Sequence, residues 1–123
     1  MYRDTIDSIL EKTDAKLALM QRSPAAFFVS SMLAGAYVGV GILLIFTLGQ
    51  QVPPAWQKLV MGMSFGIALT LVVIAGAELF TGYTMTTVFG RGDGRYGWGQ
   101  ILASWGLTWT GNLAGCALLV AVF

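Results

Sequence analysis

Apolar residues dominate three long stretches of this chain, each long enough to cross a lipid bilayer as a helix. The stretches occupy residues 24–49, 59–90 and 100–123. A helix rises about 1.5 Å per residue, so a hydrocarbon layer of roughly 30 Å takes about 20 apolar residues. The pattern therefore predicts an all-α membrane protein in which residues 23–123 form three transmembrane spans.

Residues 1–22 follow a different pattern, because charged residues alternate with apolar ones there. Asp4 is placed to cap a helix, and Asp7 lies in the first turn of that helix. We expect a short amphipathic helix on the cytoplasmic membrane surface or against a neighbouring subunit, with a solvated leader as the alternative. The apolar residues close to helical spacing are Ile6, Ile9, Leu10, Leu17 and Met20.

The second stretch is too long for one straight crossing, and it contains an acid. Its 32 residues would measure about 48 Å as one helix. Glu78 lies inside it, and an ionisable residue at membrane depth is costly and usually faces protein or water. We therefore predict a broken helix, with one half over residues 59–77, an irregular loop over residues 78–83 and a second half over residues 84–90.

The predicted break supplies the candidate chemistry. The second half-helix would begin near mid-membrane with unbonded N–H groups and the positive end of its dipole, which attract anions. Thr81 and Thr84 add hydroxyls that can cap these N–H groups or hydrogen-bond a passing anion. We expect Glu78 to accept bonds from loop N–H groups and to pin the loop, with a proton-relay acid as the alternative. Gly82 and Thr84 share this structural role.

Small residues and one amide predict how the spans pack. Three Gly-x-x-x-Gly motifs, one per span, favour close approach of helices in a compact bundle. Asn112 is expected to hydrogen-bond across helices. Phe65 and Leu69 lie four apart on one helix face, where they either narrow a pore or pack in the core. The motifs begin at Gly35, Gly62 and Gly111.

Composition excludes several classes of protein. Only 11% of the 123 residues are charged, against 56% hydrophobic, whereas a soluble domain carries roughly 25% charged residues. A net charge of +1 creates no field for nucleic acid. The absence of histidine and the single cysteine, Cys116, remove the usual acid–base catalyst and metal ligands. We expect an integral membrane protein, not an enzyme, with no metal or cofactor.

The basic residues predict the orientation of the chain in the membrane. The N-terminal segment and the loop over residues 91–99 hold six Lys and Arg residues, and the opposite side holds only Lys58. Basic residues concentrate in cytoplasmic loops, so the N-terminus and this second loop are expected in the cytoplasm. Trp56 at the outer boundary, with Tyr96 and Trp98 at the inner one, fits this arrangement as a set of interfacial anchors.

Three segments resemble the formate/nitrite transporter family, and most closely its nitrite-channel branch. The resemblance covers nearly the whole chain. It implies a bacterial inner-membrane channel or transporter for small monovalent anions, nitrite or formate, that assembles as a pentamer of aquaporin-like protomers. The segments are Ala34-Gly-Ala-Tyr-Val-Gly-Val-Gly41, Phe65-Gly-Ile-Ala-Leu with Gly76-Ala-Glu-Leu-Phe-Thr-Gly82, and Gly111-Asn-Leu-Ala-Gly115.

The resemblance also implies roles for individual residues. Thr81 would be the pore-facing threonine of the mid-membrane loop. Leu79 and Phe80 would help to form one constriction, and Phe65 and Leu69 would line the other. The N-terminal helix would contact the adjacent protomer.

The chain departs from this family in its number of spans. The family's protomer has six spans arranged as an inverted repeat, and three are predicted here. The chain is therefore expected to be the N-terminal half, whose missing partner would supply a pore histidine and a second broken helix. Two alternatives stay open. One is a half-size subunit that dimerises antiparallel, which the bias of basic residues disfavours; the other is a non-transporting assembly subunit or truncated fragment.

Overall fold

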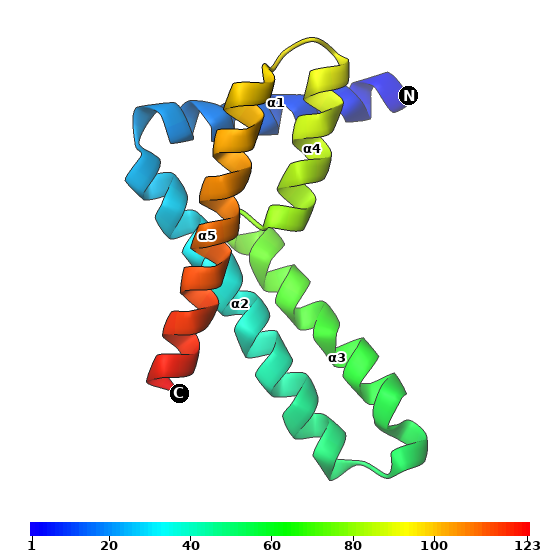
Figure 1. The fold of residues 1–123 in the computed structure, drawn as a ribbon. Coiled ribbons are helices and arrows are strands. Elements are labelled where there is room, and N and C mark those ends of the chain that lie inside the picture. The colour runs from blue at the N-terminus through cyan, green and yellow to red at the C-terminus, as the bar shows by residue number, and fades with distance from the viewer.

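The computed structural model describes all 123 residues, as five α-helices. In Figure 1, α1 lies across one end of the molecule, and α4 continues towards that end from the point where α3 stops. Three of the helices are long and apolar enough to cross a membrane: α2, α3 and α5. The all-α fold with three spans, the second of them broken, is confirmed. The bounds are α1 Tyr2–Arg22, α2 Pro24–Gln51, α3 Pro54–Ala75, α4 Phe80–Gly92 and α5 Trp98–Val122.

Proline and serine determine where the first two spans begin. Ser23 caps α2 by accepting a hydrogen bond from the Ala26 N–H at 3.3 Å, and a proline follows it in the first turn. The third helix begins at Pro54, not at the predicted residue 59, because proline is preorganised for the first helical position. The second span therefore starts earlier than predicted.

Glycines allow α2 and α5 to pack with their backbones almost in contact. A Cβ on Gly35 would lie 1.9 Å from the backbone oxygen of Asn112, and one on Gly115 would lie 1.8 Å from that of Met32. The predicted close approach is confirmed for these two motifs. It is wrong within this chain for Gly62 and Gly66, which have nothing within 4 Å. This face of α3 is open.

The N-terminal helix is amphipathic, as predicted, and packs against α2 and α4 of its own chain. It buries Leu10, Thr13 and Leu17. The prediction that Asp4 caps it is wrong. Met1 occupies the cap position, and the Asp4 carboxylate lies 3.5 Å from the terminal amino group instead.

Polar contacts join α1 to the loop between α4 and α5. The Arg95 guanidinium donates to Asp14 at 2.9 Å, and the Tyr96 hydroxyl donates to the same carboxylate. Tyr96 is only 5% exposed and packs over Gly90, so it is not the interfacial anchor predicted, whereas Trp56 and Trp98 are exposed. Burial raises the pKa of Tyr96, and the bond to Asp14 raises it further.

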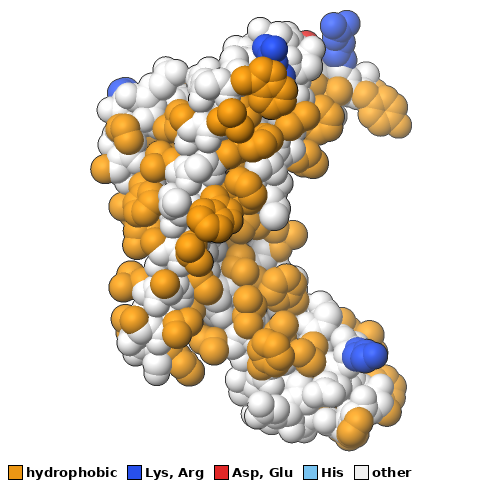
Figure 2. All heavy atoms as spheres, in the orientation of Figure 1, with side chains coloured by type: hydrophobic (Ala, Val, Ile, Leu, Met, Phe, Trp, Pro, Cys, Tyr) orange, Lys and Arg blue, Asp and Glu red, His pale blue; other side chains and the backbone are white.

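These contacts bring six of the seven basic residues to one end of the molecule. Four lie on α1 and two lie at the end of α4 and in the loop that follows, while Lys58 lies in the first turns of α3. Figure 2 shows basic side chains at the α1 end and at the turn between α2 and α3, with hydrophobic side chains over the surface between them.

Candidate functional site

The break in the second span is short and lies at residues 76–79. Gly76 adopts φ +63°, a left-handed conformation that ends α3 and favours glycine. The Ala77 N–H then bonds the Val72 oxygen at 3.0 Å. The loop predicted over residues 78–83 is too long, because α4 already begins at Phe80.

One amide, Asn112 on α5, holds the start of α4. Its Oδ1 accepts the Phe80 N–H at 2.9 Å, and its Nδ2 donates to the Glu78 and Ser31 backbone oxygens at 2.8 Å each. The expected hydrogen bonding across helices is confirmed. The Glu78 carboxylate, predicted to pin the loop, accepts no bond from a loop N–H, and Asn112 pins the loop instead.

Replacing this amide should loosen the break. Asn112→Ala leaves partly buried polar groups of α2, α4 and the break without their side-chain partner, which costs roughly 1–3 kcal/mol. We expect amide hydrogen exchange at residues 77–80 to accelerate roughly tenfold in lipid nanodiscs, as that cost implies. Thr110→Ala is the control, since that exposed hydroxyl bonds only its own helix. Equal exchange rates in the two variants would contradict the role of Asn112.

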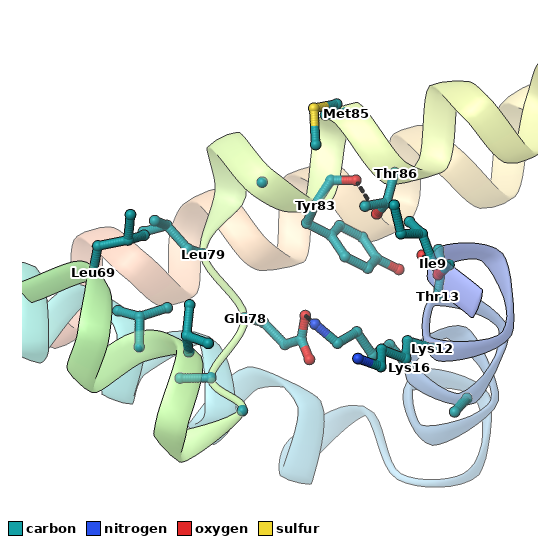
Figure 3. Close-up of a pocket in the computed structure, with 16 residues that line it drawn as sticks. Ile9, Lys12, Thr13, Lys16, Leu69, Glu78, Leu79, Tyr83, Met85 and Thr86 are labelled. Carbon is teal, nitrogen blue, oxygen red and sulfur yellow. Dashed lines mark hydrogen bonds and ion pairs between the residues drawn. The ribbon is translucent and has the colours of Figure 1, made fainter. Parts of the chain in front are cut away.

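The Glu78 carboxylate instead forms an ion pair with α1. Its Oε2 lies 3.1 Å from the Lys16 Nζ, and its side chain is 3% exposed. Figure 3 shows Lys12 and Lys16 extending from α1 towards this carboxylate. The ion pair explains how an acid is held beside the break, because a buried carboxylate needs a compensating charge.

The N-terminus of α4 presents free hydrogen-bond donors. Asn112 bonds the Phe80 N–H and the Leu79 oxygen bonds the Tyr83 N–H, but no acceptor bonds the N–H groups of Thr81 and Gly82. Both residues are exposed. The hydroxyl of Thr84, predicted to cap these groups or bind an anion, donates to the Thr81 backbone oxygen at 2.9 Å instead.

The residues predicted to line a pore divide into an exposed set and a packed set. Phe65 and Leu69 are 40% and 57% exposed on α3, and Thr81 is exposed on α4. Leu79 and Phe80 are half-buried, and Leu79 packs against a cluster of small residues and Val72. The structure thus places the exposed members along the second span, beside the open glycine face of α3.

A cavity of about 630 Å³ lies between α1, the end of α3, the break and α4 (Figure 3). Its lining includes Leu69, Glu78, Leu79 and Gly82 from the predicted site, but not Phe65, Phe80 or Thr81. It also includes Lys12 and Lys16, neither of which is among the predicted site residues. The sequence does indicate that these two residues act together, because their four-residue spacing places two cations on one helix face.

Known proteins share this sequence and this arrangement of helices. A family model for the formate/nitrite transporters matches residues 3–123. The nitrite transporter NirC of Escherichia coli (strain K12) is 48% identical over 123 residues, which are 100% of this chain and 46% of that protein. The formate channel FocA of the same strain is 32% identical over 102 residues, 80% of this chain and 35% of FocA.

A solved structure gives the same result in three dimensions. An FNT family ion channel matches with a TM-score of 0.92 and 48% identity, covering 98% of this chain and 48% of that one. Three apolar helices, of which α3 is part of the interrupted span, and the transporter relatives support an integral membrane protein. The chain belongs to the formate/nitrite transporter family. It spans about half the length of NirC and of the solved channel, covering 46% and 48% of them.

Proposed function

We propose that this chain forms the N-terminal half of a channel or transporter for small monovalent anions, with nitrite as the substrate. The observation that carries the proposal is the N-terminus of α4, where the N–H groups of Thr81 and Gly82 have no acceptor on an exposed face. Such groups bind anions through hydrogen bonds and the helix dipole. Greater similarity to NirC than to FocA supports nitrite over formate.

The proposed path follows the exposed side of the second span. The anion passes Phe65 and Leu69 on α3 and reaches the Thr81 hydroxyl and the free N–H groups of α4. Apolar side chains strip water from the anion, and the donors at the break replace part of that water. Leu79 and Phe80 narrow the path beside the break. Glu78 stays paired with Lys16, so its charge does not repel the anion.

The open face of α3 supports a second set of spans as the partner of this half. Gly62 and Gly66 have nothing within 4 Å, and glycines of this spacing allow another helix to approach closely. We propose that three further spans cover this face and close the pore, in a protomer that assembles as a pentamer. The N-terminus lies in the cytoplasm of a bacterial inner membrane, as six basic residues at one end favour.

Nitrite flux into proteoliposomes tests this function. The chain would be reconstituted alone and together with the remaining half of the Escherichia coli NirC. We expect flux only from the combined halves, and Thr81→Ala should lower it roughly tenfold by removing one hydrogen bond to a charged ligand.

Thr47→Ala is the control for this experiment, because Thr47 is an exposed threonine whose hydroxyl bonds its own helix. Undiminished flux in Thr81→Ala would refute the role of that hydroxyl. Flux by the chain alone would refute its assignment as half of a pore. Absence of flux from the combined halves would favour the alternative, an assembly subunit without transport.

A further inference from the structure

The residues that line the cavity beside the break carry one more positive charge than negative charge. Lys12 and Lys16 line it, and Glu78 is its only carboxylate. Glu78 is paired with Lys16 at 3.1 Å. Lys12 forms no ion pair with any carboxylate of the chain. The lining therefore has a formal charge of +1, which sits on the Lys12 ammonium group.

The stability of α1 does not account for this second lysine. Like charges four residues apart on a helix repel each other. The nearest acid in sequence on the inner side of α1, Asp14, bonds Arg95 and Tyr96 instead. Figure 3 nevertheless shows the Lys12 side chain extending towards the break, beside that of Lys16. Lys12 is exposed, so this repulsion is weak, and its ammonium group has no countercharge within the chain.

A second free donor lines the same cavity. Gly82 contributes to its wall, and the Gly82 N–H has no acceptor. The hydroxyls of Thr13 and Thr86 are already bonded to backbone oxygens of their own helices. The free donors of the lining are therefore the Lys12 ammonium group, the Gly82 N–H and the buried Tyr83 hydroxyl, which has no hydrogen-bond partner. Lys12 is the one among them that carries a charge.

We propose that Lys12 is the capture site for a small monovalent anion in this cavity, from which the anion passes to the N-terminus of α4. This proposal rests on the proposed function and adds an entry step to it. One bound anion neutralises the lining. The cavity, at about 630 Å³, is much larger than nitrite, so the anion keeps most of its water and binding is weak and sensitive to salt.

Side-chain NMR of lysine in the intact chain tests the capture site directly. The chain has three lysines, Lys12, Lys16 and Lys58, so their ε-carbon signals can be assigned by Lys→Arg variants. In nanodiscs of neutral phosphatidylcholine, sodium nitrite would be added at constant ionic strength with sodium gluconate. We expect a saturable shift at Lys12, while Lys58, exposed and unpaired at the opposite end, shows none. Matching behaviour of the two lysines would overturn the proposal.

The source of the anion is tested by changing the lipid. Nanodiscs that contain anionic phosphatidylglycerol should leave the response of Lys12 to nitrite intact. If the lipid alone shifts the Lys12 signal and abolishes that response, Lys12 binds a headgroup phosphate and the proposal is overturned.

Flux through the combined halves separates this proposal from the proposed function. Lys12→Gln should raise the nitrite concentration for half-maximal flux roughly fivefold, since one unit charge is removed near the entering anion. Lys12→Arg should restore the concentration dependence, and Lys58→Gln should not change it. A lower maximal flux at unchanged half-maximal concentration would contradict capture by Lys12. If the halves carry no flux, the proposed function fails, and the NMR titration still decides whether Lys12 binds an anion.

Discussion

Gly115→Ala should destabilise the chain by about 3 kcal/mol, because a new methyl group has no room between α2 and α5. Its Cβ would lie 1.8 Å from the backbone oxygen of Met32. Backbone atoms cannot rotate away as a side chain can, so the two helices must separate. This separation also weakens the contact between Gly35 and the backbone of Asn112. The measurement is the free energy of unfolding in mixed micelles, followed by circular dichroism.

Gly106→Ala is the matched control on the same helix. Nothing lies within 4 Å of a Cβ at Gly106, so this variant should gain up to about 1 kcal/mol from the higher helix propensity of alanine. Equal stability of the two variants would show that α2 and α5 do not depend on the close approach at Gly115.

Lys16→Met should cost about 3–5 kcal/mol, because it leaves the Glu78 carboxylate buried without a countercharge. The two members of the pair are not equivalent: the Glu78 side chain is 3% exposed, and that of Lys16 is 37% exposed. Glu78→Gln should therefore cost less, since the lysine left behind can reach water. The free energies of unfolding of both single variants measure this difference.

The double variant with Lys16→Met and Glu78→Gln completes the test. Removing both charges should recover most of the loss caused by Lys16→Met, because no unpaired charge stays buried. Lys58→Met is the control, as this lysine forms no ion pair. Additive losses in the double variant would mean that the two side chains do not interact.

The site was partly predictable from sequence, and the errors share one cause. The acid at membrane depth indicated that the second span is broken near Glu78, because local composition carries that information. The break at residues 76–79 depends on Asn112, which is 34 residues from Glu78 and 81 from Ser31. Its hydrogen bonds form only after α2, α3 and α5 have packed. The spacing of residues along the span does not contain this information, so it predicts a loop over residues 78–83, beyond the observed break.

The sequence by itself determined the three spans, the amphipathic N-terminal helix, the interruption of the second span and the family, since each follows from runs of apolar residues, charge or local motifs. The tertiary structure decided what Glu78 and Thr84 do. Glu78 pairs with Lys16 because α1 packs against α4. Thr84 lies within α4, so its hydroxyl bonds the Thr81 backbone oxygen and does not cap the free Thr81 N–H. It also decided which glycines matter most, because a Cβ at Gly35 or Gly115 would clash with the backbone of another helix at 1.9 or 1.8 Å, whereas Gly62 and Gly66 have nothing within 4 Å. Such pairings depend on how helices cross in space, and hydrophobic periodicity carries no information about that crossing.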